Sequence, residues 1–524
     1  FVSLYLQNFI KERHVLPDEQ VALRKGVWGC THALILDQTM IADALNQKQR
    51  PISVAWIDYS KAFDSLPHSY IRWIISALQV PKPLEKFIKN LTSSWKVRYE
   101  AKDPRGRILR SSYLQIKSGV LQGDSFSPLL FCLAMAPISH AIKQMKCGYK
   151  TASGKTKNMQ VELSHLFYMD DLKLYGSSHV NLTKMIKKVE SVSTAINMKM
   201  NTNKCAVAAF VPKRMQEEGK EESNESESCL GFPTLDEGGL YKYLGIEQTL
   251  GMKESEAWDR VEEKCCKTVT QIWSSDLTFR QKVNTFNCTV IPALSYIVAN
   301  TIKGSGKYQS VLERGEKLDK KFRKILVELQ ARYKASCVDR LYLSTELGGY
   351  GLKSVQDALM VATIYSWAYL CTKTELKSSL NLFVSMKKRG KRSVISDADH
   401  VMSKYEITAE LDPDHPSATI DGIRYTDARS LARHVVDRMH GINNETRHKT
   451  WEAKELAGRV LRTTVNIDLS SSFHWLRSGK LSSTAVRNVI AAQEGCLITK
   501  SHPCLKNLGN LNCRGCGMAI ETIE

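Results

Sequence analysis

Residues 166–175 constrain the fold more tightly than any other segment of the chain. A short apolar run leads into an acidic turn at Asp170 and Asp171, and beyond the turn Leu172 and Leu174 alternate with more polar neighbours. This pattern predicts a β-hairpin that carries two adjacent carboxylates at its tip. Like charges this close destabilise each other unless a cation neutralises them. The turn is therefore a candidate metal site.

A third carboxylate follows a buried strand. Residues 52–59 are mostly apolar, with Ile52, Val54 and Trp56 on one face, which predicts a strand that ends beside Asp58. If this strand and the hairpin are neighbours in one sheet, Asp58 joins the two hairpin carboxylates. Hard cations such as Mg²⁺ bind carboxylate oxygens together with substrate phosphates. A pair of adjacent aspartates is weak evidence by itself, because most such pairs are solvated turn residues.

The chain is strongly basic, with 74 Lys and Arg against 54 Asp and Glu and a net charge of +20. This balance suits a polyanionic partner, because each cation that neutralises a phosphate releases a counterion. A protein with a merely basic surface has the same balance. The most apolar segment, residues 128–138, is too short to cross a bilayer and contains Pro137. Charge therefore favours a nucleic-acid partner, and no membrane contact is expected.

Five segments, in this order, resemble the palm motifs of reverse transcriptases in the form used by non-LTR (LINE-type) retrotransposons. Met169 departs from the Ala common at its place, and Met is also found there in retroviral polymerases. Because all five motifs stand in the family's order, a chance match is negligible. The segments are residues 55–64, 118–130, 167–171, 196–205 and 241–245.

The resemblance implies a two-metal centre. Asp58 and Asp170 are expected to bind both Mg²⁺ ions with help from the backbone carbonyl of Tyr59, and Asp171 completes the acidic centre. Lys204 stands at the position of a general acid for the leaving pyrophosphate. An exposed surface lysine is the alternative interpretation of Lys204.

The resemblance also implies a set of residues that bind the nucleotide: Phe63, Gln122, Gly123, Tyr59 and Ala62. Phe63 stands at the steric-gate position, where a bulky ring collides with a ribonucleotide 2′-hydroxyl and so selects dNTPs. A core phenylalanine at a helix start is the alternative. Gln122 is expected to touch the incoming nucleotide and its base pair, while Gly123 lets the backbone come close.

Further segments are expected to hold the primer and the duplex. Tyr243, Leu244 and Gly245 match the primer-grip motif, which implies contact with the primer end. Residues 340–343 and 348–352 resemble the thumb of site-specific non-LTR elements that carry a restriction-like endonuclease. Helices there are expected to present basic residues to the template–primer duplex, whose backbone and A-like shape they would contact.

Cys513 and Cys516 have metal-ligand spacing and resemble the start of that group's zinc knuckle. Two ligands cannot close a structural zinc site. Cys496, His502 and Cys504 lie nearby in the sequence and are candidates to complete one. Unliganded thiols are the alternative. A Zn²⁺ ion at this cysteine pair is therefore an expectation that needs further ligands.

The expected fold class is α+β, a right-hand polymerase with partial fingers and a palm built on an antiparallel sheet, followed by a helical thumb and linker. The chain is expected to be a piece of a longer protein, cut at both ends. Residues 216–228, rich in Glu, Ser and Lys, are expected to be a solvated insertion. The expected domains are fingers and palm (1–250), helical thumb (251–370), helical linker (371–495) and the start of a truncated zinc-knuckle region (496–524).

The resemblance implies an RNA-directed DNA polymerase that copies element RNA from a nicked target-DNA primer, with two Mg²⁺ ions. Its expected partners are template RNA, primer or target DNA and dNTPs. An endonuclease and N-terminal DNA-binding regions are expected in the full-length protein, and a nuclear location is expected in a eukaryotic host. Two alternatives stay open: a catalytically idle nucleic-acid-binding remnant, and a group II intron-type or retroviral polymerase. The intact Asp58, Gln122, Asp170, Asp171 and Lys204 disfavour the remnant.

Overall fold

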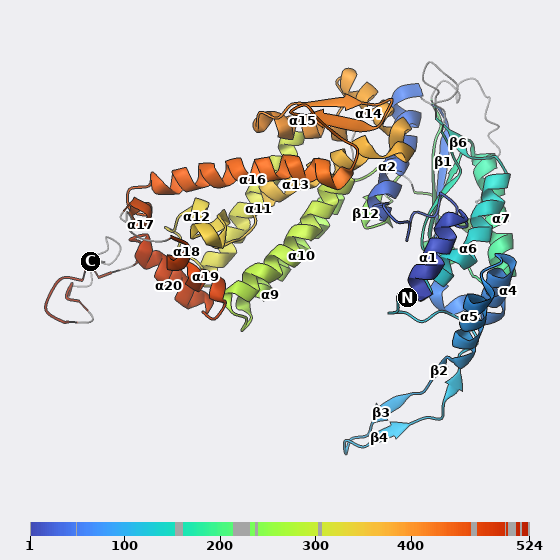
Figure 1. Ribbon diagram of the computed structural model, residues 1–524, viewed down its shortest axis with the longest axis horizontal. Helices are drawn as coiled ribbons and strands as arrows, with labels where there is room; N and C mark the ends of the chain where they lie inside the picture. The colour runs from blue at the N-terminus through green and yellow to red at the C-terminus, as the bar shows by residue number, and fades with distance from the viewer. Residues whose placement is uncertain are drawn as a thin grey trace. The chain divides into compact units, whose positions relative to one another are not determined.

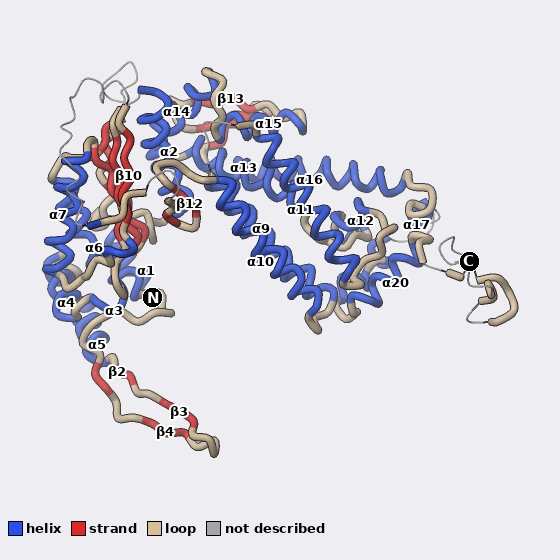
Figure 2. The backbone as a smooth tube through the Cα atoms, turned by 180° about the vertical axis from the view of Figure 1, so that it is seen from behind, coloured by secondary structure: helices blue, strands red, loops and turns tan. Residues whose placement is uncertain are grey.

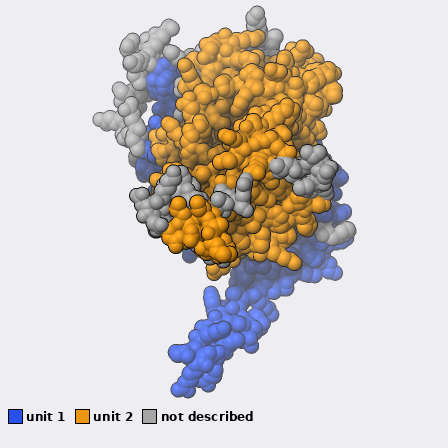
Figure 3. Space-filling view, turned by 90° about the vertical axis from the view of Figure 1, so that its left-hand side faces the viewer, with its two compact units in different colours: residues 1–253 blue, residues 254–524 orange. Residues whose placement is uncertain are grey.

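The structure is a computed structural model that describes residues 2–48, 50–151, 161–212, 231–235, 239–301, 306–462, 469–497, 499–500, 510–513 and 516–521. The chain forms two compact units, Phe1–Lys253 and Glu254–Glu524, which Figure 3 draws in two colours. Each unit is described by itself. The insertion expected at residues 216–228 lies outside the described residues.

The first unit is built around a four-stranded antiparallel sheet. Its strands are β1 (Ile52–Ile57), β8 (His165–Tyr168), β9 (Asp171–Gly176) and β10 (Ala206–Phe210), in the order β10-β1-β9-β8. Every residue of β1 is buried, as its apolar sequence predicts for a strand covered on both faces. The tube drawing in Figure 2 displays the sheet in red among the helices.

Helices and short strands surround this sheet. The helices are α1 (Val2–Glu12), α2 (Gly29–Ala42), the π-helix η1 (Asp43–Lys48), α3 (Ala62–Ser65), α4 (His68–Ala77), α5 (Lys82–Ser94), α6 (Ser127–Gln144), α7 (His179–Ala195) and the 3₁₀ turn η3 (Thr202–Lys204). The remaining strands are β2 (Lys96–Val97), β3 (Glu100–Lys102), β4 (Ile108–Arg110), β5 (Leu114–Gln115), β6 (Tyr149–Lys150), β7 (Glu162–Leu163), β11 (Tyr241–Tyr243) and β12 (Ile246–Gln248).

The two faces of the sheet carry different chemistry. One face is apolar: Ala55, Ile57, Leu172 and Leu174 belong to the core cluster that α4, α6 and α7 complete. Side chains alternate across a strand, so the intervening residues point to the other face. Trp56 pairs there with Lys173, and both are fully buried.

A buried ion pair organises this second face. The ammonium of Lys173 lies 2.6 Å from the carboxylate of Asp37 on α2 and donates to the amide oxygen of Gln248 on β12 at 2.8 Å. Asp37 also accepts from the Tyr175 hydroxyl at 2.9 Å and from the Gln248 amide at 2.9 Å. Both charged side chains are completely inaccessible to solvent. One network therefore joins α2, β9 and β12.

Three aromatic rings enclose the same ammonium. Lys173 Nζ lies 4.6 Å from the centre of the Trp56 ring, 5.3 Å from that of Tyr243 and 5.6 Å from that of Tyr175. Burial lowers the pKa of Lys173, and the neighbouring Asp37 opposes that shift. The rings add cation–π attraction to a charge that has lost its water.

The second unit is mainly helical, as the sequence predicts beyond about residue 250. Its long helix α13 (Val355–Thr372) is buried among α10, α11, α15 and α16. Its helices are α9 (Glu254–Ser274), α10 (Phe279–Asn300), α11 (Tyr308–Glu328), α12 (Val338–Tyr342), η5 (Thr345–Leu347), α13, η6 (Thr374–Leu376), α14 (Lys377–Lys388), α15 (Val394–Lys404), α16 (Ala428–Glu452), α17 (Arg459–Arg462), α18 (Leu469–Ser472), α19 (His474–Ser478) and α20 (Ser483–Gln493).

A small sheet interrupts the segment expected to be a helical linker. Strands β13 (Ala409–Asp412), β14 (Ser417–Ile420) and β15 (Ile423–Tyr425) pair antiparallel in that order. Asp421 and Gly422 join β14 to β15, and both have positive φ angles, 51° and 77°. Asp-Gly is a strong signal for a two-residue hairpin, because the glycine adopts left-handed backbone without strain.

The predicted α+β class is confirmed by the sheet of the first unit and the helices that follow it. The predicted division of the chain at residues 250, 370 and 495 stays a prediction. Within the described residues, no helix is both long enough and apolar enough to span a bilayer.

The Lys173–Asp37 pair generates a stability prediction. We expect Lys173→Met to lower the free energy of unfolding by about 3–5 kcal/mol, because it leaves Asp37 buried without a counterion. The double variant Lys173→Met/Asp37→Leu should lose less, since no unpaired charge remains. The urea dependence of hydrogen exchange in β1 and β9 measures the effect. Lys187→Met, at an exposed position of α7, is the control; losses no larger than the control's would contradict the role of the pair.

Candidate active site

The buried side chain of Gln20 holds the acidic turn through two hydrogen bonds. Met169, between β8 and β9, has a φ of 59°. Its backbone N–H donates to the side-chain oxygen of Gln20 at 3.1 Å, and the Gln20 amide donates back to the Met169 carbonyl at 3.3 Å. Gln20 is only 2% exposed. Both backbone groups at the tip are therefore paired, which fixes the carboxylate that follows.

Strand register brings the three predicted carboxylates together. β1 pairs with β9 so that Ile57 lies opposite Leu172. The next pair outward is Asp58 and Asp171, and Asp170 precedes Asp171 in the turn. The three aspartates therefore meet at one end of the sheet, as the sequence predicts.

The electrostatics of the aspartates confirm that they interact. Desolvation by the surrounding protein, then the charges of Asp170 and Asp58, raise the pKa of Asp171 to about 6 even though part of its side chain is exposed. Desolvation and the Asp58 charge also raise the pKa of Asp170. Each carboxylate thus makes ionisation of the others more costly. Perturbed carboxylates of this kind are common at functional sites.

These donors fit a hard divalent cation. Carboxylate oxygens that destabilise one another gain from a shared Mg²⁺, which completes its coordination with water and substrate phosphates. Across the described part of the chain, no three His, Cys, Asp or Glu side chains are arranged to hold a metal ion by themselves. A metal bound at these aspartates would therefore take its remaining ligands from water or from the substrate.

The segment that carries Lys204 is attached to the same end of β1. The backbone N–H of Asn201 donates to the carbonyl of Asp58 at 2.8 Å, and the N–H of Asp58 donates to the sulfur of Cys205 at 3.4 Å. Lys204 lies between them in η3 and is exposed. Tyr59 is buried, with its hydroxyl 2.9 Å from that of Ser193. Because the Tyr59 side chain is buried, only its backbone carbonyl is left for the predicted contact with Mg²⁺.

The predicted gate lies against the helix that follows the nucleotide loop. The ring of Phe63, in α3, stacks on Phe131 of α6 with 4.3 Å between centroids and 8° between planes. Ala62 is buried beside it. Gln122 and Gly123 are exposed in the loop before α6, and Gly123 has a φ of 108°. The stack fixes the orientation of the Phe63 ring.

Backbone pairing joins this loop to α3. The N–H of Val120 donates to the Phe63 carbonyl, and the N–H of Gly119 donates to the Leu66 carbonyl, each at 2.8 Å. A Cβ at Gly119 would lie 2.8 Å from Cα of Asp64. Only glycine therefore allows the close approach, and φ at Gly119 is 83°.

The predicted primer grip is the turn of the β11–β12 hairpin. Leu244 and Gly245 form its tip with φ angles of 45° and 81°. Tyr243 is buried and faces Lys173, so its ring is part of the core rather than a surface for the primer. Leu244 and Gly245 at the tip are partly exposed, and Lys242 on β11 is exposed.

Three residues at the site were not predicted from the sequence: Tyr241, Lys173 and Gln20. Tyr241 stacks on Trp56 with centroids 5.2 Å apart. Burial, followed by the charges of Asp58 and Asp171, raises the pKa of Tyr241, which places its ring near the acidic centre. Its position at the start of the primer-grip motif was the signal available in the sequence.

The cysteine pair lies in the second unit. Cys513 and Cys516 are neighbours, and hydrogen bonds from the backbone of Ala519 and Met518 lower the pKa of the Cys516 thiol. His502 and Cys504 lie outside the described residues. Zinc at this pair stays a prediction.

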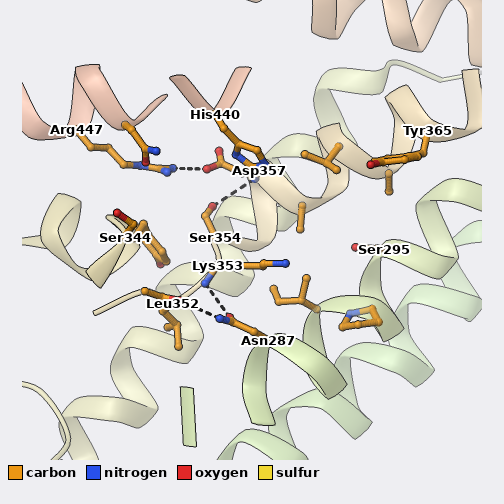
Figure 4. A pocket seen from close by; sticks show the side chains of 18 residues that line it. Asn287, Ser295, Ser344, Leu352, Lys353, Ser354, Asp357, Tyr365, His440 and Arg447 are labelled. Carbon is orange, nitrogen blue, oxygen red and sulfur yellow. Dashed lines mark hydrogen bonds and ion pairs between the residues drawn. The ribbon is translucent and has the colours of Figure 1, made fainter. Parts of the chain in front are cut away.

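A pocket of about 470 Å³ in the second unit contains none of the predicted site residues. It lies between α10, α13 and α16, and Figure 4 shows Arg447 paired with Asp357 at its edge. The Asn287 side chain accepts from the backbone of Lys353 at 3.0 Å.

Arg340, in the predicted thumb motif, is wholly buried and donates to the Gly348 carbonyl at 2.9 Å. Arg340 is thus unavailable to a duplex.

Comparison with known proteins decides the family of the first unit. Residues 2–247 match the family described as reverse transcriptase (RNA-dependent DNA polymerase). Residues 2–247 are a reverse transcriptase domain. The match spans the acidic turn, the nucleotide loop and the β11–β12 hairpin. Divalent metal ions such as Mg²⁺ serve this family generally.

Two relatives agree with the resemblance to non-LTR elements. A Pol polyprotein from the type-1 retrotransposable element R2 of Nasonia vitripennis is 27% identical over 250 residues, 46% of this chain and 22% of that protein. One from the type-2 element R2DM of Drosophila melanogaster is 24% identical over 389 residues, 72% of this chain and 34% of that protein. The predicted kinship with non-LTR retrotransposon reverse transcriptases is confirmed. The chain spans about a fifth to a third of the length of these relatives.

Solved telomerases show a weaker likeness. Apo telomerase of Candida tropicalis aligns over 73% of this chain and 60% of its own, with a TM-score of 0.35 and 12% identity. Telomerase of Candida albicans with the TWJ fragment of telomeric RNA aligns over 72% and 55%, with a TM-score of 0.32 and 10% identity. The individual residue roles of the domain stay predictions.

The raised pKa of Asp171 generates a pH prediction. The folded chain favours protonated Asp171, so its contribution to stability is full below an ordinary carboxyl pKa of about 4 and is lost as pH rises through about 6. Asp171→Asn removes this dependence. Without divalent ions, we expect the urea midpoint of Asp171→Asn to rise above the parent's between pH 4.5 and 7.5.

Adding millimolar Mg²⁺ at pH 7.5 should then raise the midpoint of the parent and not that of Asp171→Asn, because the neutral amide does not replace the carboxylate. Asp437→Asn, at an exposed position of α16, is the matched control and should behave as the parent does. If Mg²⁺ raised the urea midpoints of Asp171→Asn and of the control equally, the acidic centre would not be the metal site.

Proposed function

We propose that this chain is the RNA-directed DNA polymerase part of a non-LTR retrotransposon protein, which extends a DNA primer by copying RNA. The observation that carries the proposal is the β1–β9 register, which sets Asp58 opposite Asp171 beside the turn that holds Asp170. The family match over residues 2–247 supports it. The net charge of +20 suits a nucleic-acid substrate.

Different residues of the chain would bind the metal ions, donate a proton and contact the nucleotide. Asp58, Asp170 and Asp171 would hold two Mg²⁺ ions, which, when bound, supply activation of the primer 3′-hydroxyl and neutralise charge on the leaving pyrophosphate. Lys204, exposed beside Asp58, would donate a proton to that pyrophosphate. Gln122 and Gly123 would lie along the incoming nucleotide.

The turn at Leu244 and Gly245 would hold the primer end. Both residues sit at the tip of the hairpin whose Tyr241 lies near the acidic centre, so a primer resting there would reach the carboxylates. The primer we propose is nicked target DNA, and the template is the element's own RNA. A nuclear location, an endonuclease and DNA-binding regions in the whole protein belong to the same proposal, as does zinc at Cys513 and Cys516.

A catalytically idle nucleic-acid-binding protein is the rival function. It predicts RNA binding without extension, whereas the proposed polymerase predicts both. The anchored turn at Met169 disfavours the rival, because Gln20 satisfies both backbone groups there and so keeps the carboxylates in place. A remnant free of selection has no need of that arrangement.

Asp170→Asn tests the proposal directly. We expect extension of a DNA primer on an RNA template with Mg²⁺ to fall by at least about 10³-fold, because the remaining carboxylates cannot hold both Mg²⁺ ions that neutralise charge in the transition state. RNA affinity should stay within about twofold of the parent's. Asp437→Asn, which also removes one carboxylate but at an exposed position, is the matched control and should extend the primer as the parent does. Extension that survives in Asp170→Asn would overturn the assignment.

Phe63→Ala tests the gate. Removing the ring that stacks on Phe131 opens space beside the sugar, so incorporation of ribonucleotides relative to dNTPs should rise at least about tenfold. The ratio of kcat/KM for the two nucleotide classes measures the change. Phe63→Tyr, which keeps the ring, is the control. An unchanged ratio in Phe63→Ala would place the discrimination elsewhere.

A further inference from the structure

Residues 96–117 form an exposed β-ribbon that stands out from the first unit. β2 pairs with β5 and β3 pairs with β4, and the ribbon emerges beyond α5 in Figure 1 and at the bottom of Figure 3. Its large apolar side chains are open to solvent: Val97 39%, Tyr99 69%, Ile108 50%, Leu109 59%, Tyr113 62% and Leu114 48% exposed. Exposed apolar surface gathered on one element marks an interaction site.

The ribbon is also strongly basic. Its seven Lys and Arg against Glu100 and Asp103 give a net charge of +5 over 22 residues. Both acids are already paired, Glu100 with Arg98 at 2.7 Å and Arg110 at 2.9 Å, and Asp103 with Arg107 at 3.1 Å. The cations that have no acidic partner within the described residues are Lys96, Lys102, Arg105 and Lys117.

Aromatic rings stand among these charges. The guanidinium of Arg98 lies 5.2 Å from the centre of the Tyr113 ring. Tyr99, on the neighbouring stretch, is paired through its backbone with Ser111, whose N–H donates to the Tyr99 carbonyl at 2.9 Å. The backbone of Tyr99 is thus fixed while its ring stays open. Unpaired bases stack on exposed aromatic rings and on arginine planes, and their phosphates bind nearby cations.

We propose that this ribbon binds a single-stranded segment of nucleic acid. The surplus of four unpaired cations selects a polyanion. The ribbon of a second copy would bring the same net charge of +5 and be repelled. Readers of a duplex groove present polar side chains to base edges, whereas this ribbon presents rings and aliphatic side chains, which favours unpaired bases.

The root of the ribbon is fixed to the end of α5. The side-chain amide of Gln115 donates to the carbonyls of Ser93 at 2.8 Å and Trp95 at 3.0 Å, and the N–H of Ile116 donates to the Trp95 carbonyl at 3.0 Å. The chain then runs directly into the loop that contains Gln122. If the proposed function holds, the strand bound here is the unpaired template near the polymerase site. Binding itself does not depend on that function.

Fluorescence anisotropy with the full chain tests the ribbon, using a labelled 20-nucleotide oligouridylate and an RNA duplex of equal length as probes. We expect Tyr99→Ser/Tyr113→Ser to weaken binding of the single strand at least about tenfold, because stacking is lost. The slope of log Kd against log salt should stay unchanged. Duplex affinity should change by less than twofold.

Lys102→Gln/Arg105→Gln should instead reduce the salt slope by about 1.4, roughly 0.7 for each phosphate that is no longer neutralised. Lys187→Gln/Lys188→Gln on α7 removes the same exposed charge and is the matched control. All substituted positions are exposed, so circular dichroism should report an unchanged fold.

Single-strand affinity in the ribbon variants equal to the control's overturns the proposal. So does a greater loss on the duplex, which would make the ribbon a duplex reader, or a loss of self-association alone, which would make it a protein interface. The assay needs no nucleotide incorporation. A chain that fails to extend a primer therefore contradicts the proposed polymerase and leaves the test of the ribbon intact.

Discussion

The register between β1 and β9 is the constraint on which the rest of the first unit depends. Trp56 opposite Lys173 and Ile57 opposite Leu172 fix which side chains face which side of the sheet. A slip of one residue would turn every side chain of the strand to the other face. It would also separate Asp58 from Asp171. The active-site geometry and the core are therefore consequences of one alignment.

The buried charge of Lys173 explains why that alignment is specific. On its own face Lys173 meets Asp37, Gln248 and three rings. On the opposite face it would enter the apolar cluster around Leu172 and Leu174. An uncompensated buried ammonium costs several kcal/mol, so the slipped register is excluded more strongly than apolar side chains alone would exclude it. The pair adds specificity two residues from the acidic turn.

Much of the site could be predicted from the sequence because its parts are local. The acidic turn and the strand before Asp58 each follow from patterns within about ten residues. The contacts of Lys173 with Asp37 and of Gln20 with Met169 could not be predicted, because each joins segments more than a hundred residues apart. The alternation after the turn indicates a strand, yet it does not reveal that both faces are covered.

In the second unit, by contrast, the prediction of a helical linker was wrong at a place where the local sequence contains a hairpin signal. Asp421-Gly422 is a local hairpin signal within the segment expected to be a helical linker, and a hairpin forms there between β14 and β15. Arg340 in the thumb motif was expected among residues facing a duplex. Its guanidinium instead lies 4.6 Å from the ring centre of Trp451 and pairs with Glu494. Burial of a charge depends on distant partners, which a motif does not contain.

Close backbone approach finally explains how the nucleotide loop is held against the segment that carries the gate. Gly119 is the point of contact, because any side chain there would collide with the backbone of Asp64. Through the main chain, Gly119 itself pairs with Leu66 and its neighbour Val120 pairs with Phe63. The gate ring is therefore positioned by backbone bonds at residues 119 and 120, whereas separate bonds to Ser93 and Trp95 fix the root of the ribbon. The ribbon and the nucleotide loop are thus consecutive along the chain, and the loop is held against the gate segment at Gly119.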